Sequence, residues 1–338
     1  MPNDPPRRAG RALPPFFAAA ALLFQPLLPA IPAFARDLDT AGIPATAKAV
    51  FFVDAAPESP FGSALREIAL RKLSSSAGIV PAGDTRGLVI AILPSPGAGD
   101  PRRGVLLLRG NFDFPAIFSE AEKRNARTVD VGGRKFVDAG LAGSLPGADA
   151  KAGGANPRIL LGKAAPRILV LADAGCAGEV VAAFDAPEKA WRAPESLGRL
   201  LADSGSPLLL GVVEQSLFSQ LGLAGSGDSG EVAPSAVRIL FSEASGMLRL
   251  ELEADFLVPE DARRVGARLK TLFDLLVLEA ASDRAKDDRP QSGEIRREGD
   301  LLLQLQRAAQ FLPFGKTLRI TAEFPVSDAL KFLRAQAG

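Results

Sequence analysis

The side chains that could do chemistry in this chain are its carboxylates, lysines and hydroxyls, together with one thiol, Cys176. The sequence contains no histidine and no tyrosine. Histidine is the commonest general acid–base group, and zinc, copper and iron sites draw mainly on histidine and cysteine. The composition therefore excludes histidine-dependent catalysis, histidine-driven pH switching and zinc-type sites. We assign no catalytic, cofactor-binding or metal-binding residue, and we expect no cofactor.

Three short motifs resemble catalytic or nucleotide-binding signatures but lack the context that those signatures need. Residues 227–230 have the sequence Gly-Asp-Ser-Gly found around the nucleophile of trypsin-like proteases, yet no histidine is available to accept the serine proton. Residues 225–230 satisfy the Gly-x-Gly-x-x-Gly pattern, but they follow a predicted helix, whereas dinucleotide binding requires strand, loop and helix in that order. Residues 315–317 end like a phosphate-binding loop, but a strand follows them where a helix is needed. We interpret all three segments as loops.

The thiol of Cys176 stands just before a predicted helix over 178–186, between Asp173 and Glu179. A helix N-terminus favours a thiolate, but two neighbouring carboxylates disfavour it. We therefore predict a small buried side chain at this position. A redox role or an intermolecular disulfide is the alternative, because a single cysteine cannot form an intramolecular disulfide.

Carboxylates alone could still bind a hard cation or hydrolyse a glycoside. Asp283, Asp287 and Asp288 cluster in one segment, but basic residues are interleaved with them and the spacing of a calcium loop is missing, so we interpret the segment as a solvated charged loop. Polysaccharide clefts favour aromatic platforms, and Trp191 is the sole tryptophan. A carboxylate-dependent hydrolase acting on envelope carbohydrate is the alternative function, although no Asp/Glu pair stands out.

The clearest elements are strands in which apolar and polar residues alternate strictly, a pattern typical of antiparallel strands with one buried and one wet face. This pattern occupies 247–255 and 317–324, and residues 243–246 form a predicted hairpin turn after a strand at 237–242. The charged side chains of the two alternating strands form a candidate partner surface. Its members are Arg249, Glu251, Glu253, Arg319 and Glu323. The alternative interpretation of this surface is a plain solvated face.

The order of the predicted elements indicates an α+β fold made of two related β-α-β-β-α-β-α units, each similar to the ferredoxin-like pattern. We expect mostly antiparallel sheets with helices on one face. In the first half, strands are predicted at 49–53, 88–93, 105–109, 134–138 and 158–172, and helices at 61–74, 115–124 and 178–186. In the second half, the strands are 208–213, 237–242, 247–255 and 317–324, and the helices are 214–222, 259–281, 301–311 and 327–336. The helix at 301–311 has no counterpart in the first half.

The domain boundaries follow from this order. Residues 1–35 are predicted to be a signal peptide, 36–190 the first unit, 191–206 a hinge and 207–338 the second unit. Residues 140–156 are rich in glycine and alanine, and residues 282–300 are charged and poor in apolar side chains. Both segments are therefore predicted to be long loops.

The N-terminus has the three regions of an export signal. Arginines at positions 7, 8 and 11 precede an apolar run at 16–28, and Ala33-Phe34-Ala35 supplies a cleavage pattern of small residues. We predict cleavage near Ala35/Arg36 and a location in the bacterial periplasm or outside the cell. The apolar run is shorter than the roughly 20 residues of a membrane-spanning helix, so we expect no membrane span in the mature chain. Retention of this segment as an anchor is the alternative.

The net charge and one sequence resemblance bear on the expected partners and role of the protein. The formal net charge of +1 gives no reason to expect a nucleic-acid or anionic-membrane partner. Gly110-Asn111-Phe112-Asp113 before a predicted helix, followed by Gly133-Arg134-Lys135-Phe136, resembles uncharacterised secreted bacterial α+β repeat proteins. That resemblance covers a minor part of the chain. It implies a secreted bacterial protein and does not imply a particular activity. We expect an exported, non-enzymatic protein with a binding or scaffolding role and a protein or envelope partner, and we leave its oligomeric state open.

Overall fold

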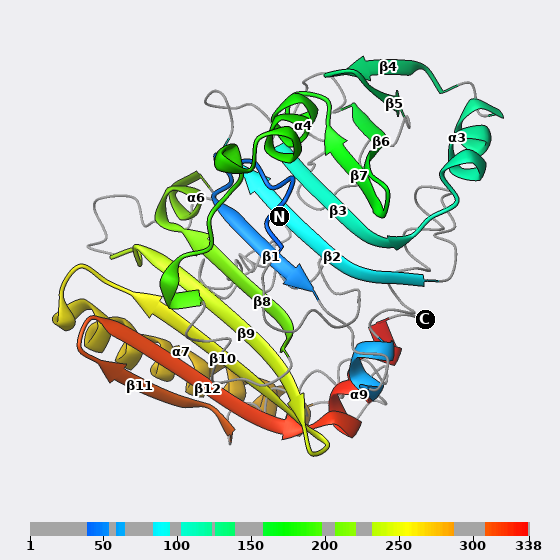
Figure 1. Ribbon diagram of the computed structural model, residues 1–338. Helices are drawn as coiled ribbons and strands as arrows, with labels where there is room; N and C mark the ends of the chain where they lie inside the picture. Colours follow the sequence, from blue (N-terminus) through cyan, green and yellow to red (C-terminus); the bar gives the residue numbers. More distant parts are fainter. Residues whose placement is uncertain are drawn as a thin grey trace, which may run out of the picture.

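The computed structural model describes residues 39–53, 59–64, 84–94, 103–123, 126–138, 158–197, 207–220, 232–286 and 308–336. In this part of the chain, 12 strands form one sheet in which every neighbouring pair is antiparallel (Figure 1). The strand order is β11-β12-β10-β9-β8-β1-β2-β3-β7-β6-β5-β4. The fold is therefore α+β with a large antiparallel sheet, which confirms the α+β class and the antiparallel pairing predicted from the sequence.

The elements have the following bounds. The strands are β1 (Ala49–Val53), β2 (Asp84–Leu93), β3 (Arg103–Asn111), β4 (Thr128–Val131), β5 (Arg134–Asp138), β6 (Ile159–Ala165), β7 (Ile168–Asp173), β8 (Pro207–Glu214), β9 (Ala236–Ala244), β10 (Met247–Asp255), β11 (Gln310–Phe314) and β12 (Thr317–Pro325). The helices are α3 (Phe114–Lys123), α4 (Ala177–Asp185), α6 (Gln215–Gln220), α7 (Pro259–Lys286) and α9 (Val326–Gln336), with a 3-10 helix η1 (Pro187–Lys189).

The hairpin of β9 and β10 forms where the sequence predicts it. Its two-residue turn consists of Ser245 and Gly246, with φ angles of 53° and 75°. Two successive positive φ angles define a type I′ turn, whose twist matches that of the flanking strands. The turn therefore sets the register in which Leu250 lies opposite Phe241 and the apolar sides of both strands coincide.

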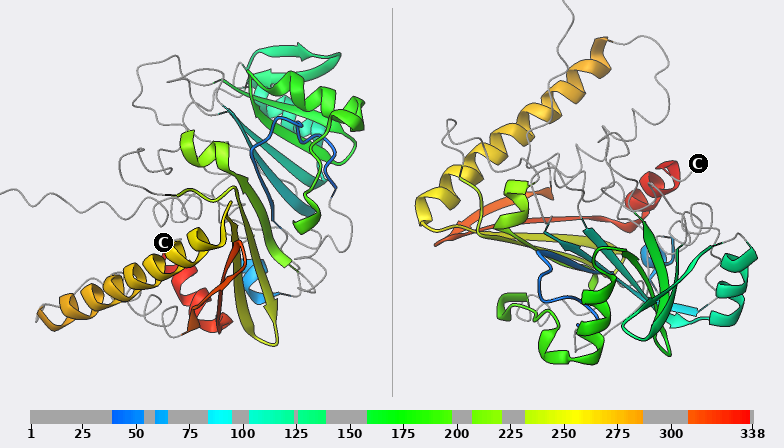
Figure 2. Two further views of the ribbon diagram at one scale, coloured as in Figure 1. Left: turned by 90° about the vertical axis from the view of Figure 1, so that its left-hand side faces the viewer. Right: turned by 90° about the horizontal axis from the view of Figure 1, so that it is seen from above.

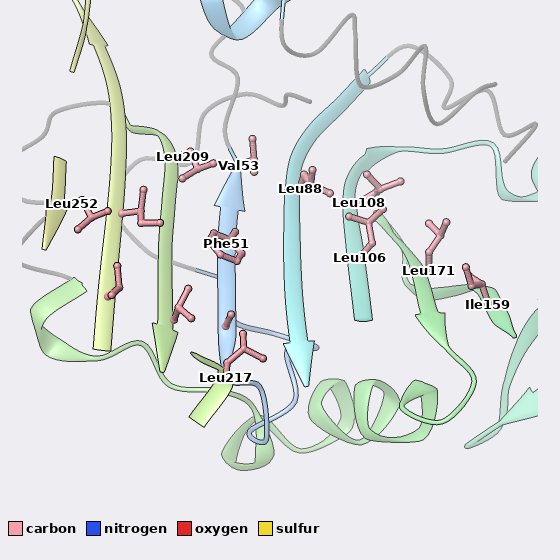
Figure 3. Close-up of a cluster of buried hydrophobic side chains, with 14 of the residues drawn as sticks. Phe51, Val53, Leu88, Leu106, Leu108, Ile159, Leu171, Leu209, Leu217 and Leu252 are labelled. Atoms are coloured by element: carbon pink, nitrogen blue, oxygen red, sulfur yellow. The ribbon is translucent and has the colours of Figure 1, made fainter. Parts of the chain in front are cut away.

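The sheet carries a buried apolar layer on each face. Alternate residues of β1 divide between the two layers, with Phe51 in one and Val50 in the other. Figure 3 shows Phe51 in the first layer, together with Leu88 and Leu209 from the strands on either side. Helices α3, α6 and α7 contribute to the first layer, and α4 contributes to the second. The prediction of helices on one face is therefore wrong, because the central strands are apolar on both sides and each side needs a cover.

The two halves of the sheet repeat the same strand order. The run β1-β2-β3-β7-β6 in the first half matches β8-β9-β10-β12-β11 in the second, and β1 pairs with β8 where the halves meet. The ferredoxin-like arrangement is not confirmed by this order. In a split βαβ unit, the strands flanking the first helix are parallel and have a third strand between them. Here β1 and β2 are direct antiparallel neighbours.

Several boundaries differ from the predicted ones. The predicted strand at 158–172 is a hairpin of β6 and β7, and the short edge strand β4 was not predicted. Helix α7 continues to Lys286, so the charged segment predicted as a loop from 282 begins within a helix. The last two residues of the predicted helix at 301–311 belong to strand β11, whose pairing with β12 overrides the local helical pattern.

The remaining predictions fall partly outside the described residues. The predicted helix at 61–74 is described at 60–64. Gly62 N–H donates a hydrogen bond of 2.8 Å to Ser59 Oγ, so Ser59 caps the start of this helix. The predicted loop at 140–156 and the part of the predicted hinge from 198 to 206 lie outside the described residues, whereas Trp191 and Leu197 are buried in the second apolar layer.

Helix α7 starts beside β11 and β12, and its far end runs away from the sheet (Figure 2). Its early apolar side chains, such as Ala262 and Leu269, join the first apolar layer. Leu275 and Leu278, farther along, are exposed. Among the helices in the described part of the chain, none combines the length and the apolar character needed to cross a membrane.

Candidate functional site

The charged side chains of β9, β10 and β12 gather on one face of the sheet, which we call the polar face. Its members are Arg238, Arg249, Glu251, Glu253, Asp255, Arg319 and Glu323. The strict alternation of these strands explains the grouping, because apolar neighbours such as Leu252 and Leu318 point into the first apolar layer on the opposite side. The structure thus brings together all five residues of the candidate surface expected from the sequence.

The register of the strands places opposite charges across from one another. Glu253 lies between Arg238 on β9 and Arg319 on β12, and Arg249 lies opposite Glu323. The ion-pair distances are 3.2 Å from Arg238 Nε to Glu253 Oε2, 4.0 Å from Arg319 Nε to Glu253 Oε1 and 3.8 Å from Arg249 Nε to Glu323 Oε1. Cross-strand pairs of opposite charge stabilise a sheet by roughly 0.2–1 kcal/mol each.

One end of the polar face is anchored by a buried arginine. The guanidinium of Arg238 donates to both oxygens of Asp255, at 2.5 and 2.9 Å, and to Ser196 Oγ at 3.2 Å. Burial alone lowers the pKa of Arg238, but the hydrogen bonds and charges of Asp255 and Glu253 outweigh it and raise the pKa above its ordinary value. Arg238 therefore stays positively charged, and its guanidinium donates to Glu253, Asp255 and Ser196 within the fold.

The centre of the polar face contains a buried carboxylate. The Glu251 residue is 2% exposed. Its Oε2 lies 3.2 Å from Arg249 Nη2, and its Oε1 forms a second ion pair with Arg319 Nη2. Breaking a buried pair by removing one partner costs about 3–5 kcal/mol. Glu251 therefore fixes two arginines in place and is not itself available to a partner.

An open pocket of about 370 Å³ lies at the edge of the polar face. It is lined by Arg249, Gln310, Leu312, Arg319, Thr321 and Glu323. Leu312 and Phe314 belong to the edge strand β11 and are 48% and 84% exposed. These two exposed apolar side chains form a strip beside a surface whose charged groups are otherwise paired with one another. Large exposed apolar groups mark contact sites. This pocket and strip are the candidate functional site.

The edge strand itself is poorly suited to pairing with another strand. Phe314 and Thr317 flank the turn between β11 and β12 and face each other across the ladder. Backbone groups alternate in direction along a strand, so Phe311 and Pro313 direct theirs toward the outer edge. Pro313 lacks an N–H and removes one outward donor. A partner is therefore better accommodated on the face of the sheet than along its edge.

Sequence reasoning missed Arg238, Asp255 and the edge strand. Arg238 alternates with apolar residues of β9, so the period-2 pattern could have identified it. The role of Leu312 and Phe314 could not be inferred once 301–311 was taken as a helix. Only the pairing of β11 with β12 places them beside Arg319.

The other candidate residues lie elsewhere. Cys176 is fully buried, and burial, together with the charge of Asp173, raises the pKa of its thiol to about 12, although Arg103 acts in the opposite direction. The predicted small buried cysteine is therefore what the structure shows. Residues 315–317 contain the β11–β12 turn, and 225–230 lie outside the described residues.

The acidic cluster named from the sequence is only partly described. Asp283 lies in α7, and Asp287 and Asp288 lie outside the described residues. Within the part that the structure describes, no group of three or more potential metal ligands is placed to hold an ion. The pocket on the polar face has a single carboxylate in its lining, Glu323, whereas glycoside hydrolysis needs two.

Comparisons with known proteins give little further guidance. No protein-family model matches the chain, and no curated protein matches it in sequence. Two solved structures of TP0453, a Treponema protein, are similar over most of their length. Crystal form I has a TM-score of 0.43 at 9% identity, covering 90% of this chain and 99% of that one. Crystal form III has a TM-score of 0.46 at 8% identity, covering 88% and 99%. At these values the similarity carries no information about function.

Proposed function

We propose that this chain is an exported, non-enzymatic binding protein that contacts its partner through the pocket and apolar strip on the polar face. The observation that carries the proposal is the exposure of Leu312 and Phe314 on the edge strand, where Leu312 lines the pocket together with Arg249 and Arg319. Aromatic side chains and arginine are enriched in the energetically important centres of protein interfaces.

The rest of the polar face supports a rigid platform for such a contact. Glu251, Glu253 and Asp255 are engaged by arginines from three adjacent strands. Side chains held in this way lose little conformational entropy when a partner binds. The arrangement therefore favours recognition by a preformed surface.

The location and the origin of the fold are part of the same proposal. The predicted signal, cleaved near Ala35/Arg36, directs the protein to the periplasm or the cell exterior. Sequencing the N-terminus of the protein purified from its native cells tests this point. The repeated strand order of β1–β7 and β8–β12 supports an internal duplication with two related units at 36–190 and 207–338.

Affinity capture from the native cell envelope tests the binding role. The tagged protein is compared with a strip variant, Leu312→Ser with Phe314→Ser, and with a control variant, Leu275→Ser with Leu278→Ser. The control also removes two exposed apolar side chains, but from the far end of α7. We expect a stoichiometric partner that the wild type and the control retain and the strip variant loses.

The result that contradicts the proposal is equally specific. If all three proteins capture the same partners in the same amounts, or if none captures a stoichiometric partner, the strip has no binding role. Thermal unfolding of each variant shows whether a loss of capture reflects the surface or the fold.

A further inference from the structure

We propose that the candidate site recognises an acidic side chain of an extended peptide segment, with Arg249 and Arg319 as the recognition groups and Leu312 and Phe314 as the apolar contact. This inference rests on the proposed function and names the chemistry of its partner. Four features of the site support it: the position of the arginines, their unsatisfied donors, a replaceable carboxylate and the placement of the apolar strip.

The first feature is that both arginines are positioned before any partner arrives. Glu251 binds Arg249 through Oε2 and Arg319 through Oε1 from within the face, yet the two arginine side chains remain 43% and 38% exposed. A guanidinium has five N–H donors in a fixed plane, so each retains donors beyond those used on Glu251. Two preoriented guanidiniums match a carboxylate, which accepts several charge-assisted hydrogen bonds.

The second feature is one donor on each arginine, Nε, that has no hydrogen-bond acceptor. The Nε atoms of Arg249 and Arg319 are buried and make no hydrogen bond to the described residues. The carboxylate oxygens that pair with these Nε atoms lie 3.8 and 4.0 Å away, beyond hydrogen-bond distance, whereas the Nη2 atoms of both arginines pair with Glu251. A buried donor without an acceptor destabilises its environment. A carboxylate bound in the pocket adds an acceptor for the donors of these guanidiniums that remain exposed.

The third feature is a carboxylate of the protein that a ligand could replace. Glu323 lines the pocket, is 61% exposed at its side chain and pairs with Arg249 only at 3.8 Å. Exposed pairs of this kind contribute little to stability. An acidic side chain of a partner can therefore take the place of Glu323 at Arg249 at little cost.

The fourth feature is the distance between the arginines and the apolar strip. Leu312 lies directly opposite Arg319 in the ladder, where side chains are about 5 Å apart. Phe314 follows two residues along on the same side, so it is the diagonal neighbour of Arg319, about 7–8 Å away. An extended peptide repeats its side chains with the same spacing. The partner segment should therefore carry an acidic and an apolar residue two positions apart.

Fluorescence anisotropy with labelled peptides tests this pattern on the full mature protein. The probe is acetyl-Phe-Ser-Glu-Ser-Leu-amide, in which glutamate and both apolar residues point to one side. We expect saturable binding that weakens about tenfold when glutamate is replaced by glutamine. A peptide in which phenylalanine and glutamate are adjacent should also bind more weakly, because its side chains point to opposite sides.

Variants with opposite expected effects separate recognition from folding. Arg319→Gln should weaken binding about tenfold, since it removes a charge-assisted contact. Glu323→Gln should tighten binding, because it removes the competing carboxylate and leaves both arginines in place. Arg263→Gln is the control, since this exposed arginine lies on α7, which packs on the opposite face of the sheet. Its binding should equal that of the wild type.

Equal binding of the glutamate and glutamine peptides, a loss of affinity in Glu323→Gln, or no saturable binding at millimolar concentration would overturn this inference. The capture experiment distinguishes it from the proposed function. Capture that depends on Leu312 and Phe314 without peptide binding leaves the binding role standing and removes the acidic-peptide chemistry. Peptide binding without any captured partner supports the acidic-peptide chemistry of the site and contradicts the proposed envelope partner.

Discussion

At the scale of single residues, the side chains with perturbed ionisation in this protein serve its structure. Cys176 Sγ lies 3.2 Å from Asp173 O, inside the second apolar layer. Burial raises the pKa of Asp173 as well, although the Gly175 N–H and the charge of Arg103 act in the opposite direction. A thiol with a pKa of about 12 is protonated at neutral pH and is a poor nucleophile.

The ionisation of Cys176 predicts a dependence of stability on alkaline pH. An unfolded thiol ionises from about pH 8.5, whereas the folded thiol keeps its proton until about pH 12. The unfolded state binds fewer protons in that window, so the free energy of unfolding should fall as pH rises through it. Below the window the contribution of this group is fully present.

Urea unfolding of the wild type and of Cys176→Ala at several pH values measures this effect. The variant loses some packing at every pH, but its stability should fall less steeply in the alkaline window. In parallel, a thiol reagent at pH 8 should modify the protein only after unfolding. Stoichiometric modification of the native protein would contradict the structural role and favour the redox alternative.

At the scale of elements, the β9–β10 hairpin shows how a local turn supports a long-range surface. The type I′ turn at Ser245 and Gly246 sets the register of β10, and that register places Arg249, Glu251 and Glu253 on the polar face. Serine is an unfavourable residue at a positive φ angle, because its Cβ crowds the backbone there. The turn is therefore a place where stability can be gained.

Ser245→Asn should stabilise the protein by about 0.5–1 kcal/mol, because asparagine followed by glycine is the preferred pair of a type I′ turn. Gly246→Ala should destabilise it by about 1–2 kcal/mol through backbone strain. A Cβ at Gly246 meets no atom within 4 Å, so steric contact does not contribute to that loss. Chemical denaturation measures both changes, and a neutral Gly246→Ala would show that the turn adopts another conformation.

At the scale of the whole molecule, the two halves of the sheet meet along β1 and β8. Gly211 on β8 lies directly opposite Phe51 on β1, and the ring of Phe51 covers the glycine. The end of this seam carries an ion pair of 2.8 Å between Lys48 and Glu214. Close contact between backbone and ring at Gly211 thus helps to join the two halves into one sheet.

Gly211→Ala should therefore destabilise the whole molecule by about 1–3 kcal/mol, as overpacking of a core does. The added Cβ would lie 2.4 Å from Phe51 Cδ1. Gly178→Ala is the matched control, because a Cβ there meets no atom within 4 Å and alanine is favoured in the helix α4. The control should be neutral or slightly stabilising in thermal unfolding. Equal stability of both variants would mean that Phe51 can move away without cost.

The amino-acid sequence by itself determined the strands with strict alternation and the charged face that they carry. It also excluded histidine chemistry, since composition alone decides that point. These features depend on side-chain periodicity within a few residues, which local sequence contains in full. The turn between β9 and β10 was predictable for the same reason.

Only the tertiary structure decided how these elements combine. Strand order, the pairing of β1 with β8 and the position of α4 on the second face depend on partners that are distant in sequence. Residues 310–314 are the clearest example. Gln310 and Phe311 end a segment with a helical pattern, but they form a strand because their backbone pairs with β12. That pairing places Leu312 and Phe314 beside Arg319, so the candidate site exists only in the folded chain.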